Sequence, residues 1–462
     1  MIAASAESSW PSGDRSQWLA IGLGAVVSLA VSCSVAANAW TVGSVEGGWI
    51  YGYGGRASAA LIAGWIAWSL AVASFAFLTF RVTRRQPLLV VIAWILFASG
   101  WHLSLRATAP YSLEAIFASD QANGFYSVAR DHHATEILRN FSRIRHGAPL
   151  HVQSNMPGKL LFIDGLQLIT RRTDLLPWMV LAISNLGALL MFGFVRDLFD
   201  DVDVGVYAAV LYLFVPSRIF FFPLLNTITP LLILAFGWSL VRLLKTDNGW
   251  YAPLTAVALY GVVIFEPLPL VTGLLFLTIT IAAIHRRTIR FDRMFLHVCV
   301  IAIAFVGIAE AVRLLFGFDI LLAFQSIGRH AVAFNQSAER PYVTWVTANL
   351  WEFMFGLGFC QAIVLAFALA RSIAGPGRWS ERLSRPLGFV TIGLLAVLAA
   401  TDIIGINRGE VARLWIFLAV FFQIPTAFVC ATLNSPFAMA VVLGVTALHT
   451  ATAASLIRFV VP

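Results

Sequence analysis

The residues of this sequence that could do chemistry gather in one polar segment of an otherwise apolar chain. This segment holds carboxylates, imidazoles and one ammonium group: Glu114, Asp120, Asp131, His132, His133, Glu136, His146, His151 and Lys159. Carboxylates can act as general bases, and cations can hold phosphate groups. A solvated loop would also be polar, but loops carry binding and catalytic residues more often than cores do. We therefore treat this segment as the first candidate site.

Asp120 is the strongest candidate for a general base. It follows a short apolar stretch, residues 113–118, and precedes Tyr126, which places it near the expected membrane boundary. Partial loss of water at that depth would make a carboxylate a stronger base. The alternative role is structural, because Ser119 or Asp120 could cap a helix that begins at Gln121.

The stretch Asn155-Met156-Pro157-Gly158-Lys159 predicts the start of an amphipathic helix over 157–170 that lies at the membrane interface. Proline fits the first turn of a helix, where its missing N–H costs nothing. Lys159 would lie in the same turn, beside free backbone N–H groups, where an anion such as a lipid phosphate is favoured. The alternative is that Lys159 reaches out to lipid headgroups.

Charged residues also stand near the ends of two later apolar runs. Glu410 and Arg413 are three residues apart at the start of a predicted helix, so they can pair along it. Arg408 precedes them in a loop and can bind a phosphate or carboxylate in bidentate fashion. Glu352 lies one turn inside a predicted span, and a carboxylate there needs a partner, either an arginine or a substrate.

His132 and His133 raise the question of a metal site. Adjacent rings cannot share one helical face, and their spacing to Glu136 is not that of a known metal motif, so a solvated helix is favoured. The four cysteines lie inside apolar runs without paired spacing, which predicts neither a metal box nor disulfides. No definite cofactor is expected, and a divalent metal is only weakly supported.

The elements that must position these residues are membrane-spanning helices. Of 462 residues, 59% are apolar and only 12% are charged, about half the charged share of a soluble domain. A water-soluble enzyme and a disordered chain are thereby excluded. About thirteen runs approach the 20 residues that a spanning helix needs: near 18–40, 57–80, 87–105, 175–195, 204–222, 227–244, 251–266, 268–285, 294–315, 346–370, 386–402, 413–432 and 436–458. The fold class expected is an all-α transmembrane bundle.

The positive charges predict which way the bundle faces. The net charge is +8, but the cations stand in short clusters between apolar runs, such as residues 286–293. Such clusters mark cytoplasmic loops rather than a nucleic-acid surface. The same count puts the long segments 106–174 and 316–345 on the outer side of the membrane.

We accordingly divide the chain into a cytoplasmic tail at 1–17, a transmembrane hairpin at 18–86 and a transmembrane core at 87–462. A cleaved signal peptide is the alternative for the first span, because Ala37-Asn38-Ala39 resembles a cleavage site. A retained helix is favoured, since the preceding region holds little positive charge and the apolar stretch is long.

These features resemble the GT-C superfamily of integral-membrane glycosyltransferases. The matching features are the many spans, the large first outer loop, the acid Asp120 ahead of Tyr126, and the proline that opens an interfacial helix. The stretch 407–415 also resembles the Arg-Gly-Glu-x-x-Arg-x-Trp sequence of some bacterial members. Where the family commonly has His-Pro, this chain has Asn155-Met156, and the next outer loop, PLLNTITP, lacks the second acid of many members.

The resemblance implies an inverting hexosyl- or pentosyltransferase with its active site on the outer face of a bacterial inner or cell membrane. Its partners would be a polyprenyl-phosphate-linked sugar donor, a glycan, lipid or protein acceptor, and membrane lipids. We expect Asp120 to be the general base, and Lys159, Arg408 and Arg413 to bind the donor phosphate. The supporting or substrate-binding residues expected are Tyr126, His151, Asn155, Glu352 and Glu410. The alternatives are a lipid or solute transporter and a non-catalytic scaffold subunit of an envelope glycan pathway.

Overall fold

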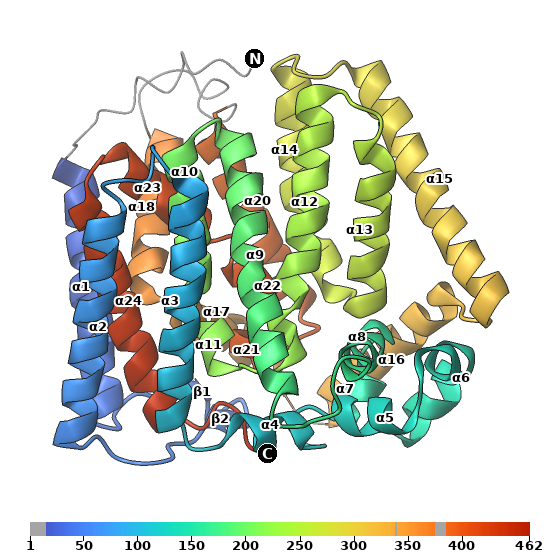
Figure 1. The fold of residues 1–462 in the computed structure, drawn as a ribbon, viewed down its shortest axis with the longest axis horizontal. Helices are drawn as coiled ribbons and strands as arrows, with labels where there is room; N and C mark the ends of the chain where they lie inside the picture. The colour runs from blue at the N-terminus through green and yellow to red at the C-terminus, as the bar shows by residue number, and fades with distance from the viewer. Residues whose placement is uncertain (1–14, 338–339, 375–384) are drawn as a thin grey trace.

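The computed structural model describes residues 15–337, 340–374 and 385–462, and in these ranges the chain is almost wholly helical (Figure 1). The bundle contains α1 (Arg15–Ala36), α2 (Ala59–Thr79), α3 (Pro87–Thr108), α9 (Leu176–Phe199), α10 (Val202–Leu213), α11 (Pro216–Phe220), α12 (Thr229–Thr246), α13 (Tyr251–Phe265), α14 (Gly273–His285), α15 (Phe291–Phe316), α17 (Tyr342–Leu357), α18 (Phe359–Ala374), α20 (Pro386–Ile404), α23 (Gln423–Thr432) and α24 (Pro436–Leu456). The predicted all-α, polytopic class is confirmed. Ten of the described helices are long and apolar enough to cross a bilayer, which makes the chain an integral multi-pass membrane protein.

The expected number of about thirteen spans was too high, because three of the apolar runs do not form long continuous helices. The run 346–370 bends by 108° between α17 and α18, and counting this pair as one span raises the total to eleven. The bend falls at Gly358, whose φ of 102° is open to glycine but not to most side chains. The run 251–266 gives only α13, about 22 Å of helix.

The third run, 413–432, is divided into short pieces. These pieces are α21 (Val411–Leu414), α22 (Ile416–Ala419) and α23. Helices α22 and α23 together, from Ile416 to Thr432, are shorter than a membrane-spanning helix. A window of apolar residues does not reveal such breaks. The tail predicted at 1–17 lies mostly outside the described residues, and α1 begins at Arg15.

The polar segments gather at one end of the bundle (Figure 1). At this end lie β1 (Val42–Ser44), β2 (Trp49–Tyr51), α4 (Leu113–Ala118), α5 (Phe125–Asp131), α6 (Ala134–Gly147), α7 (Leu150–Gln153), α8 (Gly158–Gln167) and α16 (Ile320–Ser337). The connections α2–α3 and α14–α15, which carry arginine clusters, lie at the opposite end. The helix expected over 157–170 is confirmed as α8.

The N-terminal hairpin is joined tightly to the C-terminal helix. Helices α1 and α2 both pack along α24, and Trp65 of α2 donates from Nε1 to Ser455 at 3.1 Å. β1 and β2 pair antiparallel, with Val42 opposite Tyr51. Trp345 of α17 is fully buried and donates to the backbone oxygen of Gly47 at 3.0 Å. The hairpin loop is therefore held against α17.

Candidate functional site

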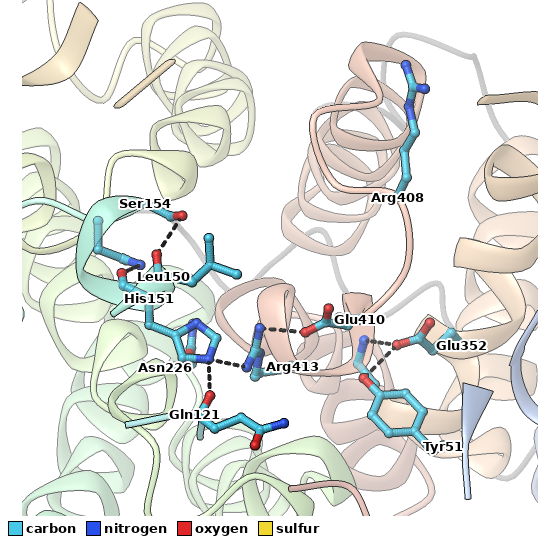
Figure 2. Close-up of polar contacts among 12 residues, drawn as sticks. Tyr51, Gln121, Leu150, His151, Ser154, Asn226, Glu352, Arg408, Glu410 and Arg413 are labelled. Atoms are coloured by element: carbon cyan, nitrogen blue, oxygen red, sulfur yellow. Dashed lines mark hydrogen bonds and ion pairs between the residues drawn. The ribbon is translucent and has the colours of Figure 1, made fainter. Parts of the chain in front are cut away.

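A polar cluster joins the first long segment of the chain to the last one. Nε2 of His151, on α7, lies 3.0 Å from the backbone oxygen of Gln121 and 3.5 Å from Nη1 of Arg413 (Figure 2). Arg413, on α21, donates from Nη2 to Oε2 of Glu410 at 2.6 Å. Packing thus brings together polar residues that are far apart in the sequence.

Glu410 lies between two arginines. Besides the bond from Arg413, it accepts a hydrogen bond from Arg340 at 3.1 Å. All three side chains are largely buried: Glu410 is 16% exposed, Arg413 15% and Arg340 9%. Burial raises the pKa of Glu410, but the charges of Arg413 and Arg340 outweigh it and hold this pKa below its usual value. The predicted Glu410–Arg413 pair is confirmed. With two cations against one carboxylate, the cluster keeps net positive charge.

Arg340 was not among the predicted site residues. It precedes α17 and is 70 residues away from Glu410 in the sequence. No short-range spacing rule predicts their contact, because the contact depends on how α17 and α21 pack. The only hint in the sequence was its place in a polar stretch before an apolar run. Arg340 also donates to the backbone oxygen of Arg408 at 2.6 Å, so it braces the loop that carries Glu410.

Arg413 retains a hydrogen-bond donor that the protein does not use. Its Nε is buried and has no hydrogen-bond partner in the described part of the chain. Burial, followed by the charge of Arg413, lowers the pKa of His151 to about 3, so the neighbouring imidazole is neutral at pH 7. The charge of Lys159 acts in the same direction, which places Lys159 within electrostatic reach of His151. An anion is the ligand that the unused N–H of Arg413 would favour.

Lys159 is buried rather than extended towards lipid headgroups. Its Nζ lies 3.0 Å from Oε2 of Glu266 and donates to Oδ1 of Asn155 at 2.8 Å, and its side chain is only 2% exposed. Glu266 ends α13 and also accepts from Thr229 at 2.6 Å. The anion expected at the start of α8 is thus a carboxylate of the protein itself. The sequence analysis did not predict this pair, because the two residues are far apart in the chain.

Arg408 does not join the cluster. Its side chain points away from Glu410 and Arg413 (Figure 2). The guanidinium donates to the backbone oxygen of Arg340 at 2.8 Å and lies over the ring of Tyr342. The structure therefore does not bring Arg408 together with Arg413 as a joint phosphate site, because the loop directs the Arg408 side chain the other way.

Asp120 is exposed, so the expected partial burial is not found. Its carboxylate accepts a hydrogen bond from Ser127. The helix expected to begin at Gln121 is not formed: residues 120–123 make a turn, in which Ser119 accepts from the backbone N–H of Ala122 at 3.1 Å. The side chain of Tyr126 is buried against Phe117. Asp120 thus lies at the surface, bonded to Ser127 and next in sequence to Gln121, while Tyr126 is part of the hydrophobic core.

The two adjacent histidines have separate carboxylate partners. Nδ1 of His132 lies 3.0 Å from Glu136, and Nδ1 of His133 lies 3.3 Å from Asp164. Within the described ranges there is no group of three or more His, Cys, Asp or Glu residues that could hold a metal ion. The structure therefore places each of the two histidines beside a different carboxylate, and not at one shared site.

Glu352 is buried, and of the two partners expected for it, an arginine or a substrate, no arginine forms an ion pair with it among the described residues. Its Oε1 accepts from the hydroxyl of Tyr51 at 3.2 Å and from the backbone N–H of Ala412 at 3.0 Å, whereas Oε2 has no hydrogen-bond partner among the described residues. Figure 2 shows Glu352 and His151 on opposite sides of Arg413. The short helix α21 therefore contacts both groups, through Ala412 on one side and Arg413 on the other.

No protein-family model matches the chain, and no curated protein sequence matches it. A positive cluster with an unused arginine donor could bind an anionic group, and the exposed Asp120, on the segment that contacts His151, could accept a proton from a second substrate.

Proposed function

We propose that the protein is a membrane glycosyltransferase of the GT-C type, which moves a sugar from a polyprenyl-phosphate donor to a glycan, lipid or protein acceptor. The observation that carries this proposal is the contact of His151 with both Gln121 and Arg413. It puts a cation with an unused donor beside the segment that carries Asp120, at the loop-rich end of an apolar bundle.

In the proposed reaction Asp120 accepts the proton of an acceptor hydroxyl. The acceptor oxygen forms a bond to the anomeric carbon as the bond from that carbon to the phosphate oxygen breaks. Attack opposite the leaving group inverts the configuration, and polyprenyl phosphate departs with the electron pair. The N–H groups of Arg413 stabilise the charge that develops on this phosphate.

The remaining predicted residues take supporting roles in this proposal. Asn155 and Lys159 fix the start of α8 through Glu266, and Glu410 orients Arg413. His151 stays neutral, and its Nε2 lies between the backbone oxygen of Gln121 and Nη1 of Arg413. Arg408 holds the loop before α17 by its bond to the backbone of Arg340. No role in binding the phosphate is assigned to Lys159 or Arg408.

The proposed orientation places these loops on the outer face of the membrane. Arginine clusters in short loops favour the cytoplasmic side, and they lie at the opposite end of the bundle. The cations of the chain are arginine except for Lys159 and Lys245, a composition typical of GC-rich genomes, which favours a bacterial inner or cell membrane.

A transporter is the second candidate, and one observation favours it. The bend of 108° between α17 and α18 lies close to the buried Glu352. Interrupted helices with ionisable groups line substrate sites in many transporters. A transporter would move a solute across a sealed vesicle without consuming a sugar donor, so the two functions are separable by assay.

The test uses the purified full chain in lipid nanodiscs with a panel of polyprenyl-phosphate-linked hexoses and pentoses. We expect release of polyprenyl phosphate from at least one donor, and a loss of about 100-fold or more in Arg413→Lys, because a point charge cannot replace the guanidinium donors. Arg313→Lys is the matched control, since Arg313 pairs with Glu310 at the same spacing, i to i+3, on an exposed helix end. Failure to consume any donor, together with Glu352-dependent solute flux in liposomes, would establish the transporter instead.

A further inference from the structure

A pocket of about 500 Å³ opens between the N-terminal hairpin and α17. One wall is the chain from Trp40 to Glu46, and the other is α17 with Thr347, Trp351 and Glu352. This volume falls in the range of small-molecule sites. Among the described residues that line the pocket there is none of the cluster residues His151, Glu410 and Arg413.

One residue that lines this pocket, Glu352, carries an unsatisfied buried carboxylate oxygen. Glu352 is 2% exposed and lines the pocket, and its Oε2 has no hydrogen-bond partner within the described ranges. Its other oxygen is fully used by Tyr51 and Ala412. A buried oxygen left without a donor is costly, and such groups in folded proteins usually have a partner. A ligand that brings a hydrogen-bond donor would supply it.

The lining selects the kind of ligand. It contains two carboxylates, Glu46 and Glu352, and among the described residues that form the pocket there is no lysine or arginine. An anionic group such as phosphate is therefore disfavoured. Three aromatic rings, those of Trp40, Trp351 and Phe355, supply flat apolar faces that carry partial negative charge.

We propose that this pocket binds the ring of a neutral sugar. Sugar hydroxyls donate to carboxylate oxygens, and the C–H faces of the ring, which carry partial positive charge, fit against indole faces. Oε2 of Glu352 accepts one of the hydroxyl hydrogens. The hydroxyls of threonine side chains on the rim, Thr41, Thr344 and Thr347, add further polar partners. The inference does not depend on the proposed transferase activity, since it concerns binding alone.

The experiment is saturation-transfer NMR on the full chain in nanodiscs, which detects weak ligands. The probes are methyl glycosides of hexoses and pentoses, tetramethylammonium and inorganic phosphate, each without any lipid-linked donor. We expect saturation of ring protons of at least one glycoside. Saturation of tetramethylammonium but of no glycoside would overturn the proposal in favour of an organic-cation site. Absence of saturation for every glycoside would also overturn it.

Two variants locate the binding. Glu352→Gln keeps an oxygen for Tyr51 and Ala412 but replaces the free acceptor by an N–H donor, so we expect at least tenfold weaker binding. Trp351→Leu acts on a side chain that is 59% exposed, so the fold does not depend on it, and should weaken binding in the same way. Trp178→Leu, on α9 outside the pocket and 44% exposed, is the matched control. Equal binding by Trp351→Leu and Trp178→Leu contradicts the proposal even if Glu352→Gln fails to fold.

Discussion

Lys159 and Glu266 form a buried ion pair, with 3.0 Å between Nζ and Oε2, that fastens the first turn of α8 to the end of α13. The two side chains are 2% and 8% exposed. The pair gives the lysine in the first turn of α8 a structural role in a chain that is poor in lysine. It anchors the segment before α8 to the bundle.

Removal of the lysine charge should destabilise the protein. Lys159→Met leaves the carboxylate of Glu266 buried without a counter-ion, which costs about 3 to 5 kcal/mol of unfolding free energy. The double variant Lys159→Met/Glu266→Gln removes the uncompensated charge and should recover much of this loss. Thermal unfolding of the purified protein in detergent measures both. Equal stability of Lys159→Met and the wild type would mean that the pair does not hold α8 in place.

Gly158 permits the close approach on which this ion pair depends. A Cβ at Gly158 would lie 2.6 Å from the backbone oxygen of Ile264 and 2.6 Å from Cα of Phe265, and backbone atoms cannot move aside as a flexible side chain can. We expect Gly158→Ala to cost about 1 to 3 kcal/mol of stability. Gly165, on the same helix, has open space around its Cβ position, so Gly165→Ala should be neutral or stabilising. The same unfolding assay would refute the close packing if the two variants behaved alike.

The Glu410 cluster should make stability depend on pH in acid. Because Arg413 and Arg340 hold the folded pKa of Glu410 below the usual value of 4.5, unfolding takes up a proton in this range. The contribution of Glu410 is therefore fully present above about pH 4.5 and is lost as the pH falls through the folded pKa. Glu410→Gln should be less stable than the wild type at pH 7, by about 3 kcal/mol. The difference should shrink at low pH, and a difference that is constant with pH would contradict the assignment.

What the sequence could predict was local. Apolar runs gave most of the spans, the proline before Gly158 gave the start of α8, and the i to i+3 spacing gave the pair of Glu410 with Arg413. The bend at Gly358 was not predictable, because an apolar window has the same composition whether or not its helix is broken.

Contacts between distant segments could not be predicted in the same way. The pairs Lys159–Glu266 and Arg340–Glu410 depend on how helices pack, and one sequence carries no spacing rule for that. Arg408 was expected in the cluster because it is charged and close in sequence to Glu410. The loop turns its side chain away, and the backbone of Arg340 accepts its hydrogen bond instead.

The measurement that tests the proposed transferase most directly compares the wild type with Asp120→Asn on the donor that the panel identifies. We expect the wild type to form a product of inverted anomeric configuration. We expect Asp120→Asn to fold normally but to be slower by about 100- to 10,000-fold, the range for loss of a general base. Asp131→Asn is the control, because Asp131 is exposed in the same segment and is paired only with Arg130 among the described salt bridges. Transfer by Asp120→Asn at the rate of Asp131→Asn would contradict the account.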